Sequence, residues 1–416
     1  GLVGSEMCIR DSVRIFCLAG PDSVGKEVLT MDIQEKRLKD TFIELVRVPC
    51  PSLQETEEAA LLARKLEALG LQVRIDDAGR PCGGATGNVW GFLPGTRPGT
   101  VRLFLEAHMD SVAPTTGTRV VERDGVLYSD GTTTLGGDDK SGIAAVLEAL
   151  AVTQEENLPH GDIQVCFTIG EETGSHGVRN LDPAWIRADM GYALDSTGHP
   201  GAIYNASPQA MDVIYTVHGK TAHAGMEPEK GVNAIMLAAR ALAQLPAWGR
   251  LDERTTLSVD LVEGGLASNI VPDRCSFTVD MRCDDPEKLE RLRDDMTALF
   301  RATVEAGGGT LSVETKIIAP AVRLPESHEA VQLAADAARN LGFPVRCDFT
   351  GGCSDANFLC GLGLPSLLLA TGMDRIHTTE ERLALADLNN AARWVLEIIR
   401  LAGRQRPRTD ARTKGE

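Results

Sequence analysis

The sequence contains no apolar run long enough to cross a bilayer, although hydrophobic residues make up 43% of its 416 residues. It also lacks a stripe of basic residues outside its short terminal tail, and its formal net charge is −17. Binding to nucleic acid needs clustered lysines and arginines, so this composition disfavours a nucleic-acid binder. We therefore expect neither a membrane nor a nucleic acid as a partner.

None of the ten cysteines forms a CxxC pair, and several lie inside apolar runs. This usage predicts a reducing compartment with mostly buried free thiols. The first thirty residues lack the basic and apolar regions of a secretory signal, so we expect a cytoplasmic protein. Residues 1–30 read as a non-native or unstructured extension before Met31, and the charged residues 404–416 as a disordered tail.

Helical and strand-like patterns alternate along most of the chain. Apolar residues at helical spacing predict helices over 34–48, 55–69 and 142–153. Short apolar or β-branched runs predict strands at 72–75, 88–92, 101–106, 163–168 and 191–194. This alternation predicts an α/β protein whose mixed sheet is sandwiched by helices.

A second kind of pattern interrupts this alternation. Strands at 211–217, 256–262, 275–282 and 311–317, with helices at 232–245 and 285–306, follow the ferredoxin-like order β-α-β-β-α-β. The alternation then resumes with helices at 328–341 and 384–402 and strands at 345–348 and 365–369. We predict that residues 209–321 are an α+β domain inserted into a larger domain of residues 31–208 and 322–403.

Several predicted strands and helices begin or end with ionisable residues. A strand ends at His108 with Asp110 two residues later, so both side chains lie on one face. Two glycines and then Asp138 and Asp139 open the helix that follows. Helix capping would also explain two acids at such a position.

Three further sites extend this set. The adjacent acids Glu171 and Glu172 follow a strand, Asp195 ends another, and His377 follows a late apolar strand. Such nitrogen and oxygen ligands suit zinc, cobalt or manganese. Two ions need a bridging carboxylate, terminal ligands for each ion, and a free acid to carry protons. The set is large enough to supply all of these.

Over residues 31–402 the sequence resembles the superfamily of peptidase T, carboxypeptidase G and succinyl-diaminopimelate desuccinylase. The resemblance rests on five ordered motifs: HxD at His108, GGDDKSG around Asp138, GEE at Glu171, the strand end at Asp195 and the late His377. It implies a di-metal exopeptidase-type sheet with an inserted lid or dimerisation domain. A homodimer through that domain is therefore expected.

The resemblance also implies individual roles. The metal ligands would be His108 and Asp195 for one ion, Glu172 and His377 for the other, and Asp138 for both. Glu171 would be the general base, and Asp110 would orient His108. Two zinc ions are the expected cofactors, with cobalt or manganese as alternatives.

Three residues of the inserted block resemble substrate-binding residues of relatives. His223 would help to hold the oxyanion, while Asn269 and Arg282 would contact the substrate backbone or carboxylate. A turn residue and an ordinary surface arginine are the alternatives for the last two. The loop 350–358 resembles an element that lines the family's cleft, although Cys353 is unexpected there. A cysteine nucleophile is disfavoured because no histidine is assigned to it.

The segments GEETGSHG (170–177) and TGGCSDANF (350–358) resemble the peptidase T-like branch more than peptidase T itself, so strict tripeptide specificity is not implied. Within this superfamily, an aspartate at the position of Asp195 resembles the aminopeptidase branch, whereas glutamate is commoner there in carboxypeptidases and deacylases. We therefore expect a metallopeptidase that hydrolyses amide bonds of small peptides, in the manner of an aminopeptidase or tripeptidase. An amidohydrolase of N-acyl amino acids with the same metal site is one alternative. A non-catalytic peptide-binding relative is the other, although every expected site residue is present.

Overall fold

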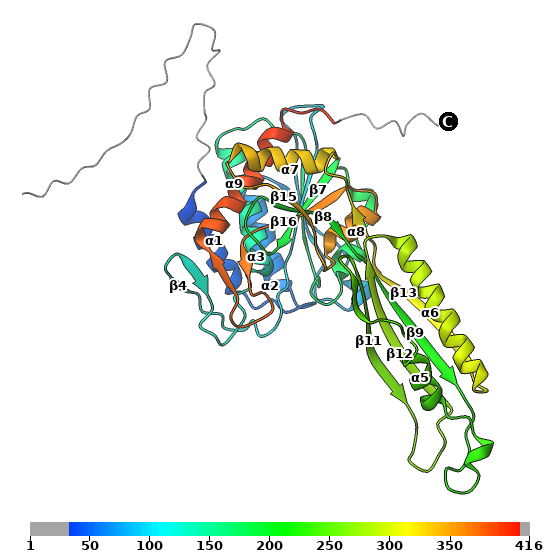
Figure 1. Cartoon of the computed structure of the whole chain (residues 1–416). Coiled ribbons are helices and arrows are strands. Elements are labelled where there is room, and N and C mark those ends of the chain that lie inside the picture. Colours follow the sequence, from blue (N-terminus) through cyan, green and yellow to red (C-terminus); the bar gives the residue numbers. More distant parts are fainter. Residues whose placement is uncertain (1–32, 408–416) are drawn as a thin grey trace, which may run out of the picture. The chain divides into compact units, whose positions relative to one another are not determined.

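The computed structural model describes residues 33–407, which form three sheets (Figure 1). The predicted extension at 1–30 and positions 408–416 of the predicted tail lie outside the described residues. Residues 404–407 are described, and the carbonyl of Gln405 accepts a hydrogen bond from the Val101 N–H. Within 33–407, no helix is long and apolar enough to cross a membrane.

The largest sheet has nine strands and a mixed topology. Its order is β1 (Gln72–Ile75), β2 (Val89–Leu93), β6 (Ile163–Thr168), β3 (Leu103–His108), β7 (Met190–Ser196), β16 (Ser366–Ala370), β8 (Ala202–Ser207) and β14 (Val322–Arg323), with β15 (Arg346–Phe349) also paired to β8. The central strands β6, β3, β7 and β16 run parallel to one another. Their carboxyl ends therefore meet at one edge of the sheet.

Helices lie against both faces of this sheet, as predicted. They are α1 (Glu35–Val46), α2 (Thr56–Ala68), α3 (Gly137–Glu155), α4 (His176–Arg179), α7 (Glu329–Asn340), α8 (Asp355–Gly361) and α9 (Leu385–Ala402). Helix α3 packs between α1 and α9 and against β3, while α4 and α8 contact each other. Phe104 of β3 packs in a buried hydrophobic cluster with Val178 of α4 and Leu359 of α8. The predicted α/β fold class is confirmed.

Residues 209–319 form a second sheet of their own. Its antiparallel order is β10 (Gly249–Asp252), β11 (Thr255–Gly264), β12 (Arg274–Cys283), β9 (Gln209–His218) and β13 (Thr310–Ala319). Helices α5 (Ala234–Leu242) and α6 (Pro286–Ala306) cover one face. Apart from β10, which we did not predict, the element order is the ferredoxin-like one.

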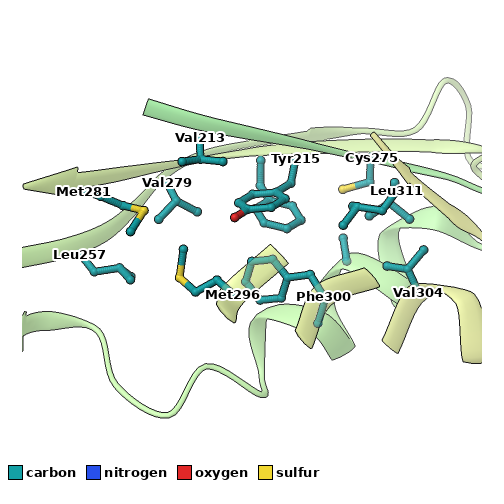
Figure 2. Close-up of a cluster of buried hydrophobic side chains, with 14 of the residues drawn as sticks. Val213, Tyr215, Leu257, Cys275, Val279, Met281, Met296, Phe300, Val304 and Leu311 are labelled. Carbon is teal, nitrogen blue, oxygen red and sulfur yellow. The ribbon is translucent and has the colours of Figure 1, made fainter. Parts of the chain in front are cut away.

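One face of this sheet carries the core of the inserted segment. Along β12 buried and partly exposed residues alternate, as expected for a sheet covered on one side. Figure 2 shows side chains of the strands facing Met296, Phe300 and Val304 of α6. The rings of Tyr215 and Phe300 meet edge to face, with their centroids 4.9 Å apart.

A third sheet consists of four very short strands. They are β17 (Met373–Asp374), β18 (Arg382–Ala384), β5 (Val126–Tyr128) and β4 (Val121–Arg123), in that order. Single turns of 3-10 helix lie at Arg80–Cys82, Pro183–Trp185 and Pro228–Lys230. The loop between β17 and β18 carries His377, so this small sheet helps to place a predicted ligand.

Candidate metal centre

The predicted ligands come together at the carboxyl edge of the large sheet. His108 is the last residue of β3, Asp195 lies at the end of β7, and Glu171 and Glu172 follow β6. Because these three strands are parallel neighbours, their ends place the four side chains side by side. His377 arrives separately, from the loop between β17 and β18.

Asp138 lies where α3 begins, but its backbone is not helical. Its φ and ψ are −83° and 105°, and those of Asp139 are −117° and 34°. The carboxylate of Asp139 accepts hydrogen bonds from the N–H groups of Gly142 and His108, so it serves the local structure. The irregular backbone leaves the carboxylate of Asp138 directed at the two histidines instead.

The carboxylate of Asp138 lies between two imidazoles. Its Oδ1 is 3.0 Å from Nε2 of His108, and its Oδ2 is 3.1 Å from Nε2 of His377. The Asp195 carboxylate lies 3.7 Å from His108 Nε2, and the Glu172 carboxylate 2.9 Å from His377 Nε2. The cluster therefore consists of two groups that share Asp138, the arrangement required for a bridging ligand.

Asp110 holds the surrounding backbone in place. Its carboxylate accepts hydrogen bonds from the N–H groups of Glu171 and Glu172, at 3.0 and 3.2 Å, and from the Ser52 hydroxyl at 2.6 Å. One of its oxygens lies 3.4 Å from Nδ1 of His108. Asp110 thus contacts both the histidine and the paired glutamates, as expected for an orienting residue.

The carboxyl groups of the centre are crowded and buried. Burial, and then the neighbouring charge of Asp138, raises the pKa of Asp195 to about 7. Burial and the charge of Asp195 also raise the pKa of Glu171 well above its ordinary value. Within residues 33–407, no lysine or arginine forms an ion pair with these carboxylates. Such crowding of like charges favours a bound cation.

The pKa values of the two histidines are also raised, but by hydrogen bonds to carboxylates and not by burial. Burial alone would lower the pKa of His108, yet hydrogen bonds to Asp110 and Asp138 raise it well above its ordinary value. Hydrogen bonds to Asp138 and then Glu172 raise the pKa of His377 to about 10. Both shifts have the same cause, which is the group of carboxylates around the two imidazoles.

The donor set fits divalent cations. Imidazole nitrogens and carboxylate oxygens are the usual ligands of zinc, and cobalt and manganese accept them too. Two groups of three residues each offer ligand atoms that lie within 4.8 Å of one another. One group is His108, Asp139 and Asp195, and the other is His108, Asp138 and Glu172. In addition, the buried Oε1 of Glu172 has no hydrogen-bond partner, so it has an acceptor position left for an ion.

A small cavity opens onto the cluster. Its volume is about 220 Å³, and it is lined by Asp138, Glu171, Glu172, Asp195 and His377 together with residues 196–197, 350, 352–354, 368, 373 and 376. Cys353 belongs to this lining, and its Sγ lies 3.5 Å from the carbonyl oxygen of Pro208. Burial raises the pKa of Cys353 to about 11, which keeps it a poorly nucleophilic thiol.

The three predicted substrate-binding residues belong to the inserted segment. His223 is exposed, and its Nδ1 accepts hydrogen bonds from the N–H groups of Gly225 and Met226. Asn269 is exposed in the loop between β11 and β12. Arg282 pairs with Asp280 on β12 at 3.0 Å, and its charge also acts on the thiol of Cys353 in the cavity lining. None of the three lines the cavity of the cluster. Their substrate contacts stay predictions.

Two buried residues beside the cluster were not predicted. Lys140 donates hydrogen bonds to the carbonyl of Met109 and to the hydroxyl of Ser111, and Glu381 contacts the backbone before Asp138. Lys140 could have been singled out from the sequence, because it lies in the GGDDKSG motif at the start of an apolar helix, where a charged residue is unusual. Glu381 gave no such signal, because it follows another glutamate.

Comparison with known proteins gives matches along most of the chain. Residues 104–401 match peptidase family M20/M25/M40. Protein YqjE of Bacillus subtilis is 40% identical over 372 residues, which is 89% of this chain and 100% of YqjE. The solved aminopeptidase PepT of Bacillus cereus is 39% identical with a TM-score of 0.84, covering 89% of this chain and 99% of that one. A solved tripeptidase of Staphylococcus aureus is 37% identical with the same TM-score, covering 90% and 100%.

Proposed function

Because the chain belongs to peptidase family M20/M25/M40, we propose that it is a two-metal exopeptidase that cleaves small peptides as an aminopeptidase or tripeptidase does. The family match confirms the resemblance to peptidase T-like metallopeptidases. The observation that carries the proposal is the carboxylate of Asp138 between His108 and His377. The names of the two solved relatives, an aminopeptidase and a tripeptidase, support a peptide substrate.

Each residue of the cluster has a part in this proposal. The ligands would be His108 and Asp195 for one ion, Glu172 and His377 for the other, and Asp138 for both. Zinc is the first candidate, and cobalt or manganese could replace it. When bound, such ions polarise the scissile carbonyl and make a nearby water more acidic.

Glu171 is the proposed general base. It lines the cavity and belongs to neither of the two histidine groups, so its carboxylate is available to the substrate. Burial and then the charge of Asp195 raise its pKa above the ordinary value. Its carboxylate would take the proton of the attacking water. It would then pass this proton to the leaving amine nitrogen. Asp110 fixes the Glu171 backbone while this happens.

Hydrolysis of two substrate panels tests the proposal. Protein cleared of metal and reloaded with zinc, cobalt or manganese is given di- and tripeptides with free N-termini, and N-acylated amino acids. We expect metal-dependent release of N-terminal residues. In Glu171→Gln we expect kcat to fall about 10² to 10⁴-fold with metal content unchanged, whereas Glu57→Gln on the exposed side of α2 is the control. Activity confined to the N-acylated panel would instead favour the deacylase alternative.

We also propose a homodimer through the inserted sheet. Strand β10 pairs only with Thr255–Leu257, so the outer edge of β11 beyond Leu257 has no strand partner within the described residues. This part of β11 carries exposed apolar side chains, since Leu261 is 61% and Val262 59% exposed. A second copy could extend the sheet across this edge. Sedimentation should give a dimer, and Val262→Lys should shift it to a monomer.

A further inference from the structure

The backbone on both sides of the bridging residue is held by one side chain, that of Glu381. This carboxylate is 2% exposed, and each of its oxygens accepts one main-chain hydrogen bond. One comes from the N–H of Gly136 at 2.8 Å and the other from the N–H of Asp138 at 2.9 Å. Both acceptor atoms of Glu381 are therefore committed to the segment that carries Asp138.

The two glycines before Asp138 make this contact possible. Gly136 has a φ of +78°, a left-handed conformation that other residues rarely adopt. A Cβ atom on Gly137 would lie only 3.0 Å from a carboxylate oxygen of Glu381. The carboxylate thus packs directly against the main chain, and the Gly-Gly pair of the motif is explained by its approach.

Glu381 also belongs to the loop that carries His377. Only three residues separate the two, and the Glu381 N–H donates a hydrogen bond to the carbonyl of Thr378. Asp138 faces His108 through one oxygen and His377 through the other. The hydrogen bonds of Glu381 therefore connect the loop of His377 to Asp138, which contacts both histidines.

We infer that Glu381 is a positioning residue that fixes Asp138 relative to His377, so that both halves of the centre bind their ions at the same time. This inference rests on the proposed metal function. Glutamine at this position would keep the shape but lose one acceptor, and its amide would direct an N–H at a backbone N–H. Residues that orient metal ligands typically change metal affinity about 10 to 100-fold when replaced.

Zinc binding to metal-free protein, measured by calorimetry, tests the inference. Glu381→Gln should weaken zinc binding by about 10 to 100-fold relative to wild type. Glu380→Gln is the matched control, because Glu380 is the adjacent residue, is exposed and, among the ion pairs of residues 33–407, pairs only with Arg375. It removes the same charge and should bind zinc as wild type does. Equal affinities of Glu381→Gln and wild type, or equal weakening in both variants, would overturn the inference.

Two further measurements separate the possible failures. If wild type itself binds no zinc, then the proposed metal centre fails and not merely the role of Glu381. If Glu381→Gln does not fold, Glu381→Asp takes its place, since it keeps both acceptor oxygens on a shorter side chain. Folded Glu381→Asp should bind zinc more weakly than wild type and more tightly than any folded variant without a carboxylate there. Unchanged affinity in Glu381→Asp would count against the inference.

Discussion

The strands that carry the candidate metal centre are buried along both faces, whereas the strands of the inserted sheet are buried along one face only. Every residue of β3 and β6 is buried, while buried residues alternate with more exposed ones in β12. Strands covered on both sides hold their ends firmly, which suits crowded charges that must keep fixed distances. The inserted sheet depends on one apolar face. The two regions should therefore respond differently to substitution.

Replacement of Asp138, the proposed bridging residue, should have the largest effect. An asparagine side chain would offer one oxygen where Asp138 offers two, so Asp138→Asn cannot face both imidazoles as a carboxylate does. We expect kcat/KM to fall by about 10³ to 10⁴-fold, or about 4 to 5 kcal/mol. Peptide hydrolysis and metal content measure this effect. Asp40→Asn on the exposed side of α1 is the control. Retention of two ions and full activity would contradict the bridging role.

The strand ends of the large sheet could be predicted because their signals are local. Strands β1 and β6 occur at the predicted residues, and His108, Asp195 and the paired glutamates lie at the predicted edge. The small sheet around His377 could not be predicted, since strands of two or three residues show no usable alternation. The role of Glu381 was hidden for a related reason. The Gly136–Gly137 pair signals a close approach, but only the fold identifies the partner, more than 240 residues away.

Removal of a ring from the inserted core should destabilise that sheet without changing metal binding. Phe300 is fully buried against Tyr215 and Phe277 (Figure 2). Phe300→Ala should therefore lower the free energy of unfolding by about 3 to 5 kcal/mol. Urea unfolding and zinc titration measure the two quantities on the same protein. Leu299→Ala, at a partly exposed position on the same helix, should cost clearly less. A large loss of zinc affinity in folded Phe300→Ala would show that the regions are not independent.

The smallest predicted effect is a change in the pH dependence of zinc binding. His377 has a pKa of about 10 in the metal-free protein, so zinc must displace a proton from it at neutral pH. The paired, protonated form stabilises the metal-free fold fully below about pH 6.5 and loses this contribution as the pH rises through 10. Zinc affinity should change in the opposite direction and increase with pH. In His377→Gln the slope should be smaller by about one proton, or roughly tenfold less per pH unit. An unchanged slope would exclude His377 as a ligand.

Anomalous diffraction at the zinc edge from crystals of the zinc-loaded protein tests the two-metal centre most directly. We predict two peaks, one on each side of the Asp138 carboxylate. The first should be bound by His108 and Asp195, and the second by Glu172 and His377. A single peak, or zinc bound away from Asp138, would contradict the account.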